Sequence, residues 1–331
     1  MRFGVSLIPQ VPIDELGDIA RHSEQLGFDD VWVYDHYFAR DTYSVLTMVA
    51  DRTERMRFGP GVASPYLRHP ALLASVTATL GEMSGGRAVL GIGPGGFEFP
   101  TELQTPIPKP LTATRESIEL VRALWSGGRV DYEGTAFSIR NAALNFTDGF
   151  SAPIYMAARG PRMLEVAGEI ADGVITHGIN EAHIDFVWER VEAGEAASGG
   201  EHTALAFWID CLVDDDLDRA RDRLRRACII MAGGKYSDSL IPVYGLEEGP
   251  VHHLREALGR GDWEEAERRV TDDMVDAFCL AGSAERCREG LDRIAAAGVD
   301  EVIIATTAWK TGDEMREGLA GVAAALGVGT R

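Results

Sequence analysis

The chain has 331 residues, of which 45% are hydrophobic and 25% are charged, and its formal net charge is −20 at pH 7. The negative charge argues against nonspecific binding to nucleic acid or anionic lipid, because the field of the protein repels phosphate groups. No segment approaches the ~20 apolar residues of a membrane span, and the first ten residues lack the architecture of a signal peptide. We therefore expect a cytoplasmic protein with a large core.

Apolar, strand-like runs alternate with amphipathic helical stretches along the chain, which is typical of βα units around a parallel sheet. One helical stripe contains Ile13, Leu16, Ile19 and Leu26. In chain order, the predicted strands are residues 3–7, 30–34, 56–62, 88–92, 154–157, 173–176, 204–212 and 301–306. Eight such units predict an α/β fold, a (β/α)8 TIM barrel rather than a doubly wound sheet.

Two segments fit no βα unit. Residues 126–152 show a hairpin-like alternation, and residues 232–280 are rich in glycine and charge. We expect both to be insertions in connecting loops of a single domain that spans residues 1–331, because barrels carry substrate or partner specificity in such loops.

The third predicted strand is interrupted by the run Gly59, Pro60 and Gly61. Proline cannot donate to a strand ladder, and glycine inside a strand marks a bulge or the close approach of another backbone or a ligand. The sequence therefore predicts an irregular strand end at this point.

Polar side chains follow several predicted strands, where barrel enzymes place their active sites. Ser6 lies at the end of the first strand, Asp35 and His36 follow the second, Glu98 follows the fourth and His177 follows the sixth. His36 stands beside a carboxylate directly after an apolar strand, which suits an acid or a hydrogen-bond donor. For His177 a hydrogen-bonded surface role is the alternative, and for Glu98 a solvated loop.

The glycine-rich stretch 91–96, "GIGPGG", follows the fourth strand. It is a weak dinucleotide fingerprint, because Pro94 interrupts it and no helix with a ribose-binding acid follows at the expected distance. We interpret it as a loop that lets a flat ligand approach the backbone.

A helix start follows the fifth strand. Arg159 and Gly160 precede Pro161, which suits the first turn of a helix. Free backbone N–H groups there, with Arg159 and Arg162 alongside, predict a phosphate site.

The sequence predicts no metal site. Its cysteines show no CxxC pair and no histidine pair at zinc-finger spacing, so we expect buried free thiols at Cys211, Cys228, Cys279 and Cys287.

Several motifs occur together in a familiar order: "VYDHY", "GPGVASPYLRHP", "GGRAVLGIGPG", "GPRMLEVAGEIADG" and "FCLAGSAERCREGL". With them, nearly the whole chain resembles the luciferase-like flavin or deazaflavin oxidoreductases, in particular the methylenetetrahydromethanopterin reductases that use coenzyme F-420. The resemblance implies hydride transfer between the deazaflavin ring carbon C5 and a small organic or pterin-like substrate.

The resemblance also implies roles for individual residues. A cis peptide bond between Gly61 and Val62 would press against the back of the deazaflavin ring, and His36 and Ser6 would face the reaction. Glu98 is a candidate from its position alone, because it follows the fourth strand and could lie near a substrate. The residues that the resemblance implies for cofactor binding are Asp35, His36, Gly61, Val62, Ala63, Gly93, Pro94, Gly95, Ala158, Arg159, Gly160 and His177.

The sequence departs from these relatives at two places. The pterin reductases that it resembles carry a glutamate where this chain has Ser6, and a hydroxyl cannot hold a negative charge opposite a cationic iminium substrate. The sugar-phosphate dehydrogenases of the family use basic residues where this chain has His177 and Asn180. Both departures argue against those two substrates.

Two other functions stay open at this point. One is a monooxygenase of the same fold that uses reduced FMN, and the other is a flavin-binding protein without catalysis. The irregular end of the third strand favours the deazaflavin enzyme. The resemblance further implies a homodimer, which a mass measurement in solution would check.

Overall fold

The main sheet is a nearly closed parallel barrel. The computed structural model describes residues 1–95, 102–200, 202–234, 236 and 238–329. Its eight barrel strands follow the order β3-β2-β1-β11-β9-β8-β7-β4, which confirms the predicted TIM-like barrel. The bounds are β1 Arg2–Leu7, β2 Asp30–Val33, β3 Arg57–Pro60, β4 Leu90–Ile92, β7 Ile154–Ala157, β8 Gly173–Thr176, β9 Ala204–Val213 and β11 Glu301–Ala305.

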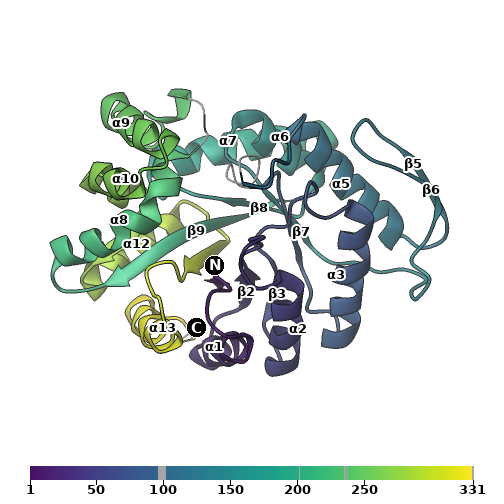
Figure 1. The fold of residues 1–331 in the computed structure, drawn as a ribbon, viewed down its shortest axis with the longest axis horizontal. Coiled ribbons are helices and arrows are strands. Elements are labelled where there is room, and N and C mark those ends of the chain that lie inside the picture. The colour runs from purple at the N-terminus through teal and green to yellow at the C-terminus, as the bar shows by residue number, and fades with distance from the viewer. Residues whose placement is uncertain (96–101, 201, 235, 237, 330–331) are drawn as a thin grey trace.

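Helices cover the outside of the barrel (Figure 1). The predicted stripe of α1 is buried at Leu16 and Ile19, which pack in the core between the helices and the outward face of the strands. These covering helices are α1 Ile13–Leu26, α2 Thr42–Arg52, α3 Pro70–Ser84, α5 Pro110–Trp125, α6 Pro161–Ile170, α7 Glu181–Ser198, α12 Ala284–Ala296 and α13 Gly312–Leu326.

Residues 126–152 include a two-stranded antiparallel hairpin, β5 Val130–Glu133 and β6 Ser138–Ala142. The buried Glu116 of α5 holds its turn by accepting hydrogen bonds from the backbone N–H groups of Thr135, Ala136 and Phe137. Figure 1 shows the hairpin at one side of the barrel, opposite a group of short helices.

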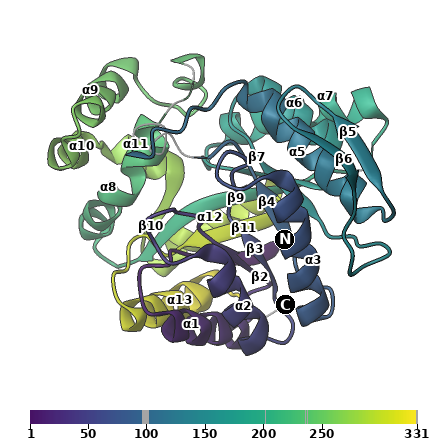
Figure 2. The ribbon, with the colours of Figure 1, turned by 45° about the vertical axis from the view of Figure 1, so that its right-hand side comes forward.

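That group has its own hydrophobic cluster, which contains Tyr244, Leu254 and Phe278. Its helices are α8 Leu217–Gly233, α9 Glu248–Gly259, α10 Trp263–Arg269 and α11 Asp272–Phe278, and Figure 2 shows them projecting beyond the barrel. The predicted insertion ends too late, because Cys279 and Leu280 belong to a strand that the sequence analysis missed. This strand, β10 Cys279–Gly282, pairs in parallel with the last residues of β9.

The barrel closes weakly between β3 and β4, which we call the seam. Among the described residues, the two segments are joined there by isolated β-bridges, one between Phe58 and Ala88 and one between Ala63 and Ile92. The regular strands are accordingly shorter than predicted, since β3 ends at Pro60 and β4 begins at Leu90.

Glycine makes the seam possible. A Cβ atom on Gly59 would lie 2.2 Å from the carbonyl oxygen of Val89, and one on Gly91 would lie 2.2 Å from the carbonyl oxygen of Pro60. The two backbones therefore approach more closely than any side chain would allow.

An ionic group closes the N-terminal end of the barrel. Asp30 accepts hydrogen bonds from Arg2 at 2.8 Å and from Arg57 at 2.6 Å, and Glu301 accepts one from Trp32 Nε1 at 2.8 Å. Burial, together with the nearby Asp30, raises the pKa of Glu301 to about 8. The charges at this end are thus bonded to one another, and the polar residues at the C-terminal end are the candidates for chemistry.

We predict that Gly91→Ala destabilises the protein by about 1–3 kcal/mol, because the new methyl group meets a backbone carbonyl that cannot swing away. Gly321→Ala is the matched control, since no atom of the described residues lies within 4 Å of its Cβ position in α13. It should stabilise the protein by about 0.5–1 kcal/mol. Urea unfolding measures both, and equal effects would contradict the close approach at the seam.

We predict that the free energy of unfolding of Glu301→Gln increases relative to that of the wild type as pH rises. The folded-state pKa of about 8 exceeds the ordinary value of 4.5, so the stability from this carboxyl is full below about pH 4.5 and is lost as pH rises through about 8. The amide can still accept from Trp32. Unfolding free energies of variant and wild type across this range should diverge, whereas the exposed Glu289→Gln should give parallel curves; parallel curves for Glu301→Gln would refute the raised pKa.

Candidate active site

The predicted polar residues that the structure describes lie at one end of the barrel. This end is formed by the last residues of the eight strands and the loops that follow them, and we call it the C-terminal rim. Ser6 lies on β1 between Trp32 of β2 and Ala305 of β11. Trp32 and Ala305 belong to the cluster inside the barrel, so Ser6 faces inward as well. Its hydroxyl is buried and has no hydrogen-bond partner among the described residues.

His36 follows β2 and is half-buried. Its Nδ1 accepts a hydrogen bond from the backbone N–H of Phe38 at 3.2 Å, and its ring stacks on Tyr37 with centroids 4.6 Å apart. Since Nδ1 accepts, the neutral ring carries its proton on Nε2. The geometry therefore supports a hydrogen-bond donor at the rim.

Asp35 lies near the charged side chains of Arg68 and Asp41 and near the ring of Tyr43. Burial raises the pKa of its carboxyl, and the nearby Arg68 guanidinium partly offsets that effect. Arg68 forms an ion pair with Asp41 and lies over the ring of Tyr43, 4.4 Å from its centroid. The Tyr43 hydroxyl is buried without a partner among the described residues.

The third strand ends in the irregular backbone that its sequence predicts. The peptide bond between Gly61 and Val62 is cis, as the resemblance implies. A Cβ on Gly61 would lie 2.9 Å from the indole of Trp208 and 3.0 Å from Cβ of Trp32, so the turn rests directly on two tryptophans inside the barrel.

The fourth strand supplies the neighbouring backbone. Ala63 donates to the carbonyl of Gly91 at 2.9 Å and accepts from Gly93 at 3.0 Å, and Ser64 donates to the carbonyl of Pro94 at 3.1 Å. The structure thus brings together the predicted residues 61–63 and 93–94. Gly95 follows with a positive φ of 89°, and Glu98 lies outside the described residues.

The start of α6 is open. Gly160 is its N-cap, and among the described residues no side chain caps it and no atom lies within 4 Å of the Cβ position of Gly160. The first turn therefore presents backbone N–H groups beside the buried Ala158, and Arg162 is exposed nearby. This arrangement fits an anion.

The guanidinium of Arg159 has other partners. It donates to the carbonyl of Met231 at 2.8 Å and to the Tyr244 hydroxyl at 3.2 Å, and it lies 4.5 Å from the centroid of the Tyr236 ring. Its side chain therefore ties the end of β7 to the helical insertion, and the backbone around it marks the helix start.

His177 is neutral in this environment. Burial and the nearby Arg159 lower its pKa to about 3, and its Nδ1 lies 3.3 Å from the carbonyl oxygen of Trp208. Asn180 caps α7, accepting from the N–H of His183 at 3.1 Å. Neither residue supplies a positive charge for a phosphorylated substrate.

Two inward-facing residues of β9 were missed in the sequence analysis. Trp208 and Asp210 continue the inward row of Ala206, and Asp210 is only 1% exposed. The signal was present in "ALAFWIDCLV", where a single acid interrupts an otherwise apolar strand.

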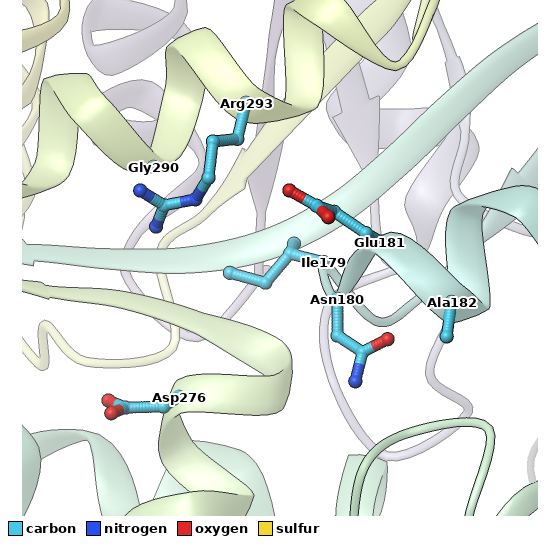
Figure 3. A pocket seen from close by; sticks show the side chains of 7 residues that line it. All are labelled: Ile179, Asn180, Glu181, Ala182, Asp276, Gly290 and Arg293. Atoms are coloured by element: carbon cyan, nitrogen blue, oxygen red, sulfur yellow. The ribbon is translucent and has the colours of Figure 1, made fainter.

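A polar cavity of about 400 Å³ lies among α7, α11 and α12, beside the loop that follows β8. Figure 3 shows the carboxylate of Glu181 pointing toward Arg293 across it. None of the residues predicted to bind the cofactor or to catalyse lines this cavity. Its lining residues are Ile179, Asn180, Glu181, Ala182, Asp276, Gly290 and Arg293.

Three other features limit the chemistry. The four cysteines are buried free thiols, as predicted. No cluster of three or more metal-ligating side chains occurs in the described part of the chain. Within the same residues, no helix is long and apolar enough to cross a membrane.

Known proteins resemble this chain over most of its length. It is 37% identical over 309 residues to a 5,10-methylenetetrahydromethanopterin reductase of Archaeoglobus fulgidus, with 92% of each chain covered. It is 32% identical to the reductase of that name from Methanolobus tindarius, with 92% of this chain and 93% of the relative covered.

The fold comparison agrees. The structure of the coenzyme F-420-dependent tetrahydromethanopterin reductase from Methanopyrus kandleri superimposes with a TM-score of 0.85 at 29% identity, covering 96% of this chain and 97% of that one. The sequence model described as luciferase-like monooxygenase matches residues 1–301. The protein is therefore an enzyme that belongs to the luciferase-like monooxygenase family.

Proposed function

We propose that this enzyme is a coenzyme F-420-dependent oxidoreductase that transfers a hydride between deazaflavin C5 and a small organic substrate. The observation that carries the proposal is the open, uncapped start of α6 at Gly160, on the same rim as the irregular end of β3. In a chain of net charge −20, such a local anion site is what a phosphate-bearing cofactor needs. The similarity to a reductase named for F-420 supports the choice of cofactor.

The residues present fit the cofactor in two places. The N–H groups of the first turn of α6 would hold its phosphate, and the backbone at Gly61, Val62 and Ala63 would support its ring. The bound deazaflavin would supply the hydride chemistry, and the protein would supply position and a site with little water.

His36 would act on the ring or the substrate as a donor. Its Nε2 carries the proton because Nδ1 is occupied by the N–H of Phe38. An imidazole whose Nδ1 is held in this way directs its Nε2–H along a fixed line, which gives an oriented hydrogen bond.

The substrate side of the rim favours an uncharged molecule over a cationic pterin. Ser6 has no charge, and its hydroxyl lacks a partner among the described residues. A hydroxyl can accept or donate a hydrogen bond to a neutral group, but it cannot compensate a cationic iminium.

We predict that the purified protein binds F-420 at least roughly tenfold more tightly than FMN, a difference of about 1.4 kcal/mol. Gly160→Asp should weaken F-420 binding by a factor of about ten or more, because its carboxylate repels the phosphate. The same variant should keep its thermal stability, since aspartate is a good N-cap and no atom of the described part of the chain lies within 4 Å of the new Cβ. Equilibrium dialysis measures binding; tighter binding of FMN would instead indicate the flavin monooxygenase.

We predict that His36→Ala lowers turnover by roughly ten- to ten-thousandfold, the range for a lost acid–base or donor group. The fold should persist, because His36 lies at the rim and outside the hydrophobic clusters. His253→Ala, an exposed residue of α9, is the matched control and should leave turnover unchanged. Turnover of His36→Ala equal to that of the control would remove the role given to His36.

A further inference from the structure

Asp210 is a buried acid at the C-terminal end of β9. It follows Ala206 and Trp208 in the row that faces the inside of the barrel, whereas Phe207, Ile209 and Cys211 pack outward against the helices. Its position in the row places it one layer above Trp208, toward the rim.

Thr307 connects this acid to the surface of the rim. Its hydroxyl is hydrogen-bonded to the carboxyl of Asp210, and Thr307 itself is exposed just after β11. A hydroxyl both donates and accepts, so it can pass a proton between the buried carboxyl and a molecule at the rim.

The surroundings raise the pKa of Asp210, so a large share of its carboxyl groups carries a proton near neutral pH. Burial raises its pKa to about 7, and no cation among the described residues offsets that effect. The titratable groups beside it are thiols. Cys279 is its register partner on β10, and Cys211 follows it on β9. Cys287 of α12 lies next to Cys211. Each of these thiols is also buried and uncharged in its ordinary form.

Asp210 faces the seam across the barrel. In the strand order, β9 is the fourth strand from β3 in either direction, so it stands opposite β3. The side chain of Trp208 reaches that far, since a Cβ on Gly61 would lie 2.9 Å from its ring. If the cofactor ring rests against the end of β3, its open face turns toward the wall formed by β9, β11 and β1.

That wall carries two polar residues, Ser6 and Asp210, next to the rim. Ser6 pairs with Ala305, and Ala305 pairs with Asp210, so the two polar residues lie in one register row with only a methyl side chain between them. The Ser6 hydroxyl is buried and has no hydrogen-bond partner in the part of the chain that the structure describes, which is an independent sign that this wall receives a polar ligand.

We propose that Asp210 and Thr307 form a proton-transfer pair for the substrate, and that the substrate is a neutral carbonyl compound or the corresponding alcohol. The proposal rests on the proposed hydride-transfer function and narrows its substrate class. Thr307 touches the substrate oxygen, and Asp210 acts through Thr307 as the residue that stores the proton.

The step balances for a carbonyl substrate. The carbonyl carbon accepts the hydride with its electron pair, and the π bond of C=O breaks to leave a lone pair on oxygen. That oxygen takes a proton from the Thr307 hydroxyl, which takes one from Asp210, and the resulting carboxylate is reprotonated from water. Alcohol oxidation runs the same transfers in reverse, whereas a cationic iminium would accept the hydride without needing a proton.

The first measurement uses the protein without cofactor. Carbon-13 labelling of aspartate carboxyl groups allows each titration to be followed by NMR in wild type, Asp210→Asn and Thr307→Val. We expect one aspartate to titrate near neutral pH, to be absent in Asp210→Asn and to shift upward in Thr307→Val, because the carboxylate loses a donor. An Asp210 that titrates below about pH 5 would overturn the proposal.

The second measurement follows oxidation of reduced F-420 by acetone, cyclohexanone and benzaldehyde across the pH range. Asp210→Asn and Thr307→Val should each lose roughly ten- to thousandfold in turnover of whichever of these carbonyls the wild type reduces, while Thr307→Ser, which keeps the hydroxyl, should stay within about threefold. Wild-type turnover in either disabled variant would overturn the proton-transfer pair. Tight F-420 binding with no turnover of any of the three carbonyls would overturn the substrate class and leave the cofactor assignment intact, whereas loss of F-420 binding would refute the proposed function itself.

Discussion

Two backbones meet at the seam between β3 and β4 with no room for a side chain, and the arrangement of the rim depends on that approach. Gly59 and Gly91 each face a carbonyl oxygen of the other segment, and Gly61 rests on the indole of Trp208 and on Cβ of Trp32. Side chains at these positions would push the strands apart and lift the end of β3 away from the barrel interior. The seam thus leaves bare backbone at the rim, where a flat ring can be placed against it.

The two ends of the barrel divide stability from chemistry. At the N-terminal end, Asp30 forms ion pairs with both Arg2 and Arg57, so these charged groups have a structural role. At the C-terminal rim, burial and the nearby Arg159 lower the pKa of His177, and burial raises the pKa of Asp210 with no cation among the described residues to offset it. Both shifts favour the uncharged form, which suits a reaction in which the cofactor supplies the charge that moves.

Much of the fold follows from local pattern. The predicted bounds of the eight barrel strands lie within two residues of the observed bounds. This agreement is expected, because the apolar runs and the amphipathic stripes between them are local signals. β10 was not predicted because its four residues directly follow a helical segment. They form a strand by pairing in parallel with the last residues of β9, which is a contact between distant parts of the chain.

The site was only partly predictable for a similar reason. Ser6, His36 and the residues around Gly61 and Gly160 follow strands directly, so their place on the rim can be inferred from chain order. The direction of the Arg159 side chain cannot, since one of its partners, Tyr244, lies 85 residues away in the helical insertion. Asp210 lies in an apolar run that predicts only a buried strand. Its hydrogen bond to Thr307, which is 97 residues further along the chain, is a tertiary contact that the local pattern does not contain.

The most direct test of this account is a crystal structure of the protein with bound coenzyme F-420. The account predicts the ring against the backbone of Gly61 and Val62, the phosphate at the N–H groups that follow Gly160, and the open face of the ring toward Asp210 and Thr307. A ring bound elsewhere, for example in the polar cavity beside Arg293, or one turned with its open face toward β3, would contradict it.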